Sequence, residues 1–216
     1  LVQELQSYCT SENIKIPSEY IDILDLGQLY IKHGDSFFEK RDYSKAIKNY
    51  SSSLAFYQKN KDINNQEICL IKLSRTYVRF DNHKKLIGYA KQALKLTEIS
   101  NNNKTKSYAL GYMGIAHNNK GDIKKAIDLL SSAYDISKEI KDKTGECIWV
   151  GNLGTCLNKI GKIEEAISFY TTAVVLAGEI ANKSMKAQWV GNLGIAYNKI
   201  GDFKKAEEYY LNALSI

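Results

Sequence analysis

The sequence WVGNLG, residues 149–154, occurs again without change at residues 189–194, forty positions later. The same spacing holds across the chain, where one equivalent position in every unit carries a small or aliphatic side chain, namely Ala46, Leu86, Ala126, Ala166 and Ala206. Periods of about 20 to 50 residues are typical of solenoids, in which each unit packs on its neighbours. The chain is therefore predicted to contain five units of one design. A solenoid presents a long surface, which favours recognition over catalysis.

The composition is that of a protein with a well-packed core. Of its 216 residues, 44% are hydrophobic and 25% are charged, which are ordinary values for a globular chain. The net charge of +6 is mild, and nucleic-acid binders usually carry a denser basic stripe, so nucleic acid is not an expected partner. No apolar run approaches the roughly 20 residues that span a bilayer, so we expect no membrane span.

The four cysteines, Cys9, Cys69, Cys147 and Cys156, form no CxxC pair and have no metal-ligand spacing with histidine. We interpret them as reduced thiols buried in the core. This pattern favours a reducing compartment and predicts a cytoplasmic protein. No Gly-rich phosphate loop and no motif for a catalytic nucleophile is present, so we expect no cofactor, no metal and no enzyme activity.

Each unit is predicted to form two amphipathic helices. In the third unit, apolar side chains at helical spacing place the first helix from about Ser107 to Lys120. Gly121 would end this helix, because glycine adopts the left-handed conformation of a helix terminus without steric cost. Asp122 is the expected N-cap of the second helix. The sequence thus predicts an all-α fold built from antiparallel helix pairs.

Small residues at one point of each first helix would allow close packing within a pair: Gly34, Ser74, Gly114, Gly154 and Gly194. In the fifth unit, Gly194, Tyr197, Ala206 and Tyr210 follow a pattern of small residue, aromatic, alanine and aromatic that resembles the tetratricopeptide repeat. The resemblance covers residues 27–216 and implies a right-handed superhelical solenoid. We expect Trp149 and Trp189, which recur at one position, to pack between units.

Two departures from the tetratricopeptide pattern are the length of the unit and the residue at its end. Each unit has forty residues, whereas the family's usual unit has about 34 and ends with a proline that is absent here. Long units of this kind are similar to those of kinesin light chain, of Leu-Gly-Asn polarity adaptors and of Rap-type bacterial peptide sensors. The repeat alone does not choose among these three.

The expected division of the chain is an N-terminal helical segment, residues 1–26, followed by the five units at 27–66, 67–106, 107–146, 147–186 and 187–216. A short helix is predicted at 1–8, and the single proline, Pro17, is expected to start another. The last unit is truncated within its second helix. Leu211, Leu214 and Ile216 would then remain partly uncovered, so we expect a fragment of a larger protein in which the array or another domain continues.

Resemblance to tetratricopeptide arrays implies that the first helices line a concave groove. The candidate peptide-binding residues there are asparagines, whose side chains both donate and accept hydrogen bonds to a peptide backbone: Asn118, Asn152, Asn158, Asn192 and Asn198. Asparagine is a poor helix former, so Asn152 and Asn192 in mid-helix are the best candidates. The alternative for Asn118, Asn158 and Asn198 is that they only end helices before a glycine.

A group of cations is the second candidate feature of the groove. Lys72, Arg75 and Arg79 are spaced to share one helical face, and Lys159 and Lys199 follow in later units. Together they predict an electropositive stripe that selects acidic side chains or a terminal carboxylate. The alternative is a solvated outer face.

These features predict a protein–protein interaction module that binds an extended peptide or a partner helix in its groove. The alternative is a ligand-sensing regulatory domain that controls an attached DNA-binding or nucleotide-hydrolysing effector. A helix-turn-helix or phosphate-binding loop in a longer chain would favour this second hypothesis.

Overall fold

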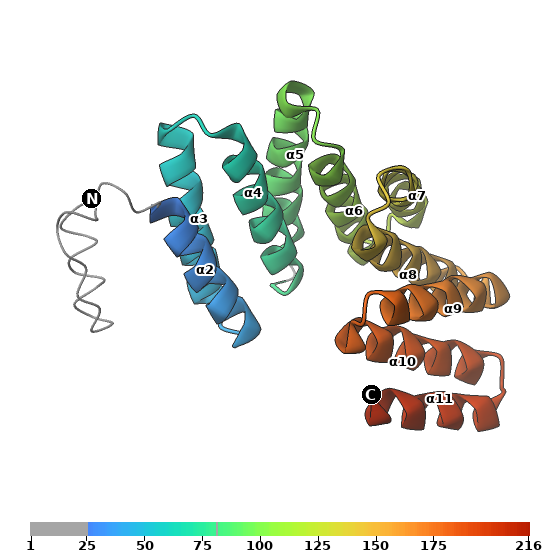
Figure 1. Cartoon of the computed structure of the whole chain (residues 1–216). Helices are drawn as coiled ribbons and strands as arrows, with labels where there is room; N and C mark the ends of the chain where they lie inside the picture. Colours follow the sequence, from blue (N-terminus) through green and yellow to red (C-terminus); the bar gives the residue numbers. More distant parts are fainter. Residues whose placement is uncertain (1–25, 81) are drawn as a thin grey trace.

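The computed structural model describes residues 26–80 and 82–216. These residues form ten α-helices and no β-strand: α2 (Leu26–Glu39), α3 (Tyr43–Lys59), α4 (Ile63–Val78), α5 (His83–Ser100), α6 (Asn103–Asn119), α7 (Ile123–Glu139), α8 (Lys143–Lys159), α9 (Ile163–Glu179), α10 (Lys183–Lys199) and α11 (Phe203–Ser215). They pack as five consecutive pairs (Figure 1). The predicted helices at 1–8 and from Pro17 lie outside the described residues.

The helix ends follow from short polar side chains and from backbone geometry. The side chains of Asp42, Asp62, Asn82, Asn102, Asp122, Asn182 and Asp202 each accept a hydrogen bond from the backbone N–H three residues later, which satisfies an otherwise unpaired donor. The predicted N-cap Asp122 is confirmed, and Gly121 before it has φ +86°. The predicted start at Ser107 is wrong by four residues, because the Asn102 cap begins α6 at Asn103.

Packing within the first, fourth and fifth pairs follows the predicted contact between a small and a large residue. A Cβ built on Gly34 would lie 2.4 Å from the Tyr50 ring, and one on Gly194 would lie 2.6 Å from Tyr210. Gly154 faces Tyr170 in the same way. In these pairs the two helices therefore approach closely because the first helix has no side chain at that point.

The two tryptophans pack the third, fourth and fifth units against one another. Trp149 of α8 is fully buried and lies against Gly111 of α6, and Trp189 of α10 lies against Gly151 of α8. The Trp149 indole N–H donates to the Ser107 hydroxyl at 2.9 Å. The prediction that these residues pack between units is confirmed. We call these two Trp–Gly contacts the unit seam.

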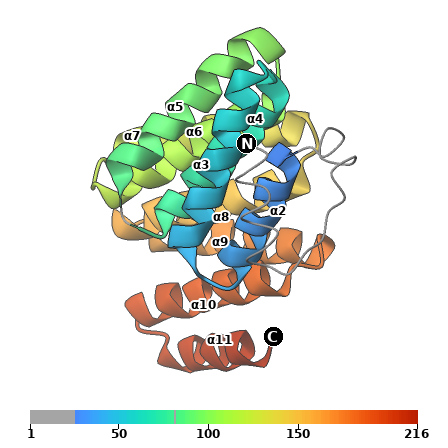
Figure 2. The ribbon, with the colours of Figure 1, turned by 90° about the vertical axis from the view of Figure 1, so that its left-hand side faces the viewer.

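The first helices also contact one another directly, α4 with α6, α6 with α8 and α8 with α10. They therefore lie on the inner side of the curve, and the second helices cover the outside. Figure 1 shows the helix axes turning from upright at α3–α5 to flat at α8–α11, and Figure 2 shows the same curl from the side. Of the predicted buried thiols, Cys69, Cys147 and Cys156 are confirmed as buried and form no disulfide, while Cys9 is not described.

Candidate functional site

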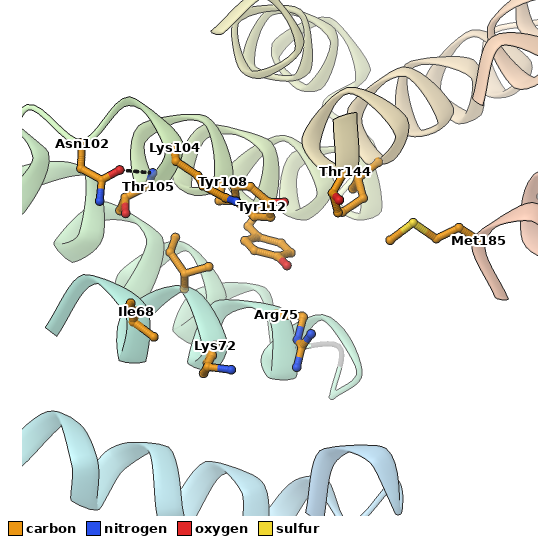
Figure 3. A pocket seen from close by; sticks show the side chains of 12 residues that line it. Ile68, Lys72, Arg75, Asn102, Lys104, Thr105, Tyr108, Tyr112, Thr144 and Met185 are labelled. Atoms are coloured by element: carbon orange, nitrogen blue, oxygen red, sulfur yellow. Dashed lines mark hydrogen bonds between the residues drawn. The ribbon is translucent and has the colours of Figure 1, made fainter. Parts of the chain in front are cut away.

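A cavity of about 580 Å³ opens on the inner side of the array, within the usual size range of ligand sites. Four consecutive first helices and one cap residue contribute its lining: Ile68, Ile71, Lys72 and Arg75 of α4; Asn102, Lys104, Thr105, Tyr108 and Tyr112 of α6 and its cap; Thr144 and Ile148 of α8; and Met185 of α10 (Figure 3). We call it the groove cavity. It combines an aliphatic lining with cations and phenols.

Lys72 has its charge compensated inside the protein. Its ammonium lies 2.6 Å and 2.9 Å from the two carboxylate oxygens of Asp35 on α2. The Tyr50 hydroxyl donates to the same carboxylate at 2.7 Å, and the ammonium also lies 5.7 Å from the centre of the Tyr50 ring. This cluster joins the first two units along the edge of the groove cavity and leaves Lys72 little net charge to offer a ligand.

Arg75 lies one turn further along α4 in a different setting. Its guanidinium stacks on the Phe38 ring, 3.9 Å from the ring centre, a contact that fixes a planar cation against an aromatic face. Its Nε is buried without a hydrogen-bond partner. Within residues 26–80 and 82–216, no carboxylate forms an ion pair with Arg75.

Two tyrosines form the α6 wall of the cavity. The rings of Tyr108 and Tyr112 meet the Trp149 ring edge to face at 5.3 Å and 5.6 Å between centres. Burial raises the pKa of Tyr112 to about 12, and the charges of Arg75 and Arg79 oppose that rise. The pKa of Tyr108 is raised by burial and by the charge of Asp142. Both phenols are therefore neutral at physiological pH and can donate hydrogen bonds.

The third cation, Lys104, lies at the rim of the cavity. Its ammonium is 3.8 Å from the Asp142 carboxylate, and its side chain is 64% exposed. Below it, Asn102 caps α6 and donates from Nδ2 to the buried Glu67 carboxylate at 2.8 Å. Glu67, fully buried on α4, also accepts from the Ser100 hydroxyl. This polar network holds the start of α6 against α4.

The structure separates the five cations predicted for the groove. Lys72 and Arg75 line the cavity together, whereas Arg79 is exposed at the end of α4 and does not. Lys159 and Lys199 donate to the backbone carbonyls of Asn118 and Asn158 at 3.0 Å and 3.1 Å. These two lysines satisfy carbonyls at the ends of the preceding first helices.

None of the five predicted asparagines lines the cavity. Asn118 is buried at 4% exposure, Asn158 is half-buried and Asn198 is exposed. Asn152 donates from Nδ2 to the carbonyl of Ile148 in its own helix at 2.8 Å. It lies one turn beyond Ile148, and Asn192 lies two turns beyond Met185, so both extend the cavity-facing side of their helices. Their role in binding stays a prediction.

Sequence reasoning missed most of the cavity lining. Ile68, Tyr108 and Ile148 lie forty positions apart, as do Lys72 and Tyr112, but the residue type changes within each series, so a search for identical residues does not select them. A sequence signal did exist, because Tyr108 and Tyr112 are aromatic residues on one face of a helix whose opposite face carries the small packing residues.

Two absences hold for the residues that the structure describes. No helix among them is both long and apolar enough to cross a membrane. In the same residues, no cluster of three or more histidine, cysteine or acidic side chains has an arrangement that would hold a metal ion.

Solved structures with similar folds were found at low sequence identity. A Rap protein complexed with the competence and sporulation factor superposes with a TM-score of 0.81 at 20% identity, covering 88% of this chain and 53% of that one. The Rap conjugation gene regulator of plasmid pLS20, in complex with the Phr* peptide, gives 0.81 at 18% identity, with 93% and 56% covered. A putative kinesin light chain from Podosopora anserina gives 0.63 at 12% identity, with 87% and 92% covered.

These similarities confirm the predicted resemblance in fold to Rap-type sensors and kinesin light chain, and with it the right-handed superhelical solenoid. The chain spans about half the length of the two Rap proteins. No curated protein matches the sequence. The sequence pattern of the tetratricopeptide repeat matches residues 105–174 and 146–216, more than half of the chain. The chain belongs to the tetratricopeptide repeat family.

Proposed function

We propose that the chain is a peptide-binding module and that an extended peptide, or one face of a partner helix, occupies the groove cavity. The observation that carries this proposal is the cavity itself, lined by four consecutive first helices. A ligand there would contact several units at once. Such a surface suits an elongated ligand better than a compact one.

The chemistry of the lining supports a peptide with apolar and acidic side chains. Ile68, Ile71, Ile148 and Met185 offer aliphatic surface, and α4 and α6 add cations to it. The net charge of +6 acts in the same direction at long range. Asn152 and Asn192 would then pair with the peptide backbone beyond the cavity.

The similar solved structures support the same proposal. The two Rap structures are named for complexes with a signalling factor and with a peptide. The kinesin light chain is similar along nearly its whole length. Transfer of peptide binding from those proteins to this chain is part of our proposal.

A second candidate function is a sensor that controls an attached effector. It is favoured by the span of the cavity, because residues from α4 and from α10 line the same space. An occupant in contact with both would favour one superhelical pitch over others. The similar pLS20 protein is itself described as a gene regulator in complex with a peptide. A ligand-dependent change in the radius of gyration, measured by small-angle X-ray scattering, would support the sensor over the static scaffold.

The test of peptide binding uses a displayed library of random peptides of about eight residues, which extend to roughly 28 Å. The wild-type chain is compared with Ile68→Glu, because Ile68 lines the cavity and is 44% exposed, so a charge there disturbs the groove more than the core. The matched control is Ile99→Glu on α5 of the same unit, where the side chain is 66% exposed and outside the cavity.

We expect peptides selected on the wild-type chain to lose binding to Ile68→Glu and to keep it with Ile99→Glu. Circular dichroism should show equal helicity for the three proteins. Equal binding to both variants, or no enrichment of any peptide on the wild-type chain, would contradict the proposal.

A further inference from the structure

We infer that Arg75 is the anchor of a subsite for one carboxylate, and that an aliphatic side chain next to this carboxylate packs on the isoleucines of the groove cavity. This inference rests on the proposed peptide-binding function. It replaces the predicted stripe of several cations by a single cation, Arg75, that binds a single negative charge of the peptide.

The three cations of the cavity differ in whether a carboxylate of the protein already neutralises them. Lys72 contacts both oxygens of Asp35, and Lys104 has Asp142 as its nearest carboxylate. Arg75 is the one cation of the cavity that has no carboxylate partner among the described residues. A half-buried guanidinium in this state gains more from an incoming anion than an ammonium already paired with one.

The side chains around Arg75 hold its guanidinium in an orientation suited to an anion. The stack on Phe38 at 3.9 Å holds the guanidinium plane in place, so little side-chain entropy is lost when an anion binds. The neutral phenol of Tyr112 lies across the cavity from Arg75 (Figure 3). A cation and a neutral donor on opposite sides suit a carboxylate, which accepts hydrogen bonds on both oxygens.

The charge balance distinguishes a carboxylate from a phosphate. A phosphoryl group carries about −1.5 to −2 charges at neutral pH and is bound by clusters of arginines. The cavity has one uncompensated cation, which matches the single charge of a carboxylate. This carboxylate can belong to an aspartate or glutamate side chain or to the C-terminus of a peptide.

The aliphatic part of the lining decides what surrounds the carboxylate. Ile71 lies one turn before Arg75 on the same face of α4, and Ile68 lies a turn before that. Ile148 and Met185 add apolar surface from α8 and α10. The preferred ligand is therefore an acidic group with a leucine-like neighbour rather than a run of acidic residues.

Four synthetic probes separate the two sources of the carboxylate. They are acetyl-Gly-Leu-Glu-Leu-Gly-amide, its Gln counterpart with an amidated end, the Gln counterpart with a free C-terminal carboxylate, and the counterpart with phosphoserine in place of Glu. Binding is measured by competition against a library peptide that binds the wild-type chain. The proteins are the wild-type chain, Arg75→Gln, Arg75→Lys and the control Arg79→Gln, which removes the same charge from the C-cap of α4, outside the cavity.

We expect one of the two carboxylate probes to compete at roughly tenfold lower concentration than the amidated Gln probe, as a charge-assisted hydrogen bond implies. Which of the two does so identifies the source. Arg75→Gln should remove this preference, Arg75→Lys should weaken it because an ammonium lacks the planar fork, and Arg79→Gln should keep it.

Three results would overturn the inference. In the first, the amidated Gln probe competes as well as the two carboxylate probes. In the second, the phosphoserine probe competes better than either carboxylate probe. In the third, Arg75→Gln still prefers a carboxylate probe over the amidated Gln probe. In each case the library peptide still binds, so the proposed function stands. If no library peptide binds the wild-type chain, the proposed function itself fails. Circular dichroism of the Arg75 variants confirms that each is folded.

Discussion

The unit seam and the groove cavity differ in how far their residues recur along the chain. At the seam, Trp149 and Trp189 occupy equivalent positions and lie against equivalent glycines, Gly111 and Gly151. The cavity lining also occupies positions forty residues apart, but its residue types differ: Lys72 is equivalent to Tyr112, and Lys104 to Thr144. Contacts that set the spacing of the units are the same from unit to unit, whereas contacts offered to a ligand vary.

This difference predicts that changes at the seam affect stability and that changes in the cavity affect binding. A solenoid is stabilised by contacts between neighbours, so each seam contributes to the free energy of unfolding of the array. The cavity side chains are partly solvated and contribute less. The four predictions below test this separation.

The largest effect is expected for Trp149→Ala. Loss of a fully buried indole should lower the free energy of unfolding by about 3–5 kcal/mol, through lost burial and the cavity left at Gly111. Trp189→Ala is the control, because the Trp189 indole nitrogen has at most a weak contact with the Cys147 thiol, whereas that of Trp149 bonds to the Ser107 hydroxyl. Urea denaturation should show a loss about 1 kcal/mol larger at Trp149. Equal losses would show that the Ser107 bond contributes nothing.

The next largest effect is a loss of stability at alkaline pH, caused by ionisation of Tyr112 in the cavity wall. The pKa of Tyr112 is about 12 in the folded chain and 10.0 for a free phenol. Between these values the unfolded state releases its proton first, so the free energy of unfolding falls as pH rises above about 10. The loss is roughly 1.4 kcal/mol per pKa unit.

Urea denaturation at a series of pH values from 9 to 12 measures this effect, and Tyr112→Phe is the matched variant. The variant should lose less stability over that range than the wild-type chain. Identical alkaline profiles for the two proteins would contradict the assigned burial of Tyr112.

A third prediction concerns the polar contact between the second and third units, where no tryptophan occurs. Glu67→Ala removes the buried acceptor of Ser100 and Asn102 and should cost about 2 kcal/mol. Glu67→Gln retains an acceptor oxygen and should cost less. Because Asn102 also lines the cavity, Glu67→Ala should in addition weaken peptide binding, unlike Trp189→Ala. A Glu67→Ala variant with normal stability would show that this network does not stabilise the contact between α4 and α6.

The smallest effect is expected in a loop between two units. Ala181 has φ +52°, a left-handed conformation that is unfavourable for a residue with a Cβ. Ala181→Gly should raise the free energy of unfolding by about 0.5–1 kcal/mol without changing binding. The reverse control, Gly121→Ala at φ +86°, should lower it by a similar amount. Thermal denaturation measures both, and destabilisation by Ala181→Gly would contradict the assigned backbone conformation.

The helix pairs, the small-to-large contacts and the packing role of Trp149 were predictable from sequence because each unit has the same physical constraint. Gly154 must admit Tyr170 just as Gly34 must admit Tyr50. A constraint repeated at a fixed interval appears in the sequence as a repeated residue. The helix starts were less accurate, because Asn102 is one of many asparagines and its capping role depends on local geometry.

The groove cavity was only partly predictable. Lys72 and Arg75 were identified by their shared helical face, but their different states depend on Asp35, which is 37 residues from Lys72 in sequence. Lys159 and Lys199 lie on first helices as predicted, yet they bond to backbone carbonyls. Met185 and Ile68 line the same cavity because the array curls. This curl is the sum of small rotations between successive units, and the sequence of a single unit does not determine that sum.

The most direct test of the account is to map where a bound peptide touches the array. A library-selected peptide carrying a photoreactive phenylalanine is crosslinked to the wild-type chain, and the attached residues are identified by mass spectrometry. We predict crosslinks on α4, α6, α8 and α10, including Tyr108, Tyr112 or Met185. Crosslinks confined to the second helices α5, α7 and α9 would contradict the claim that the groove cavity is the binding site.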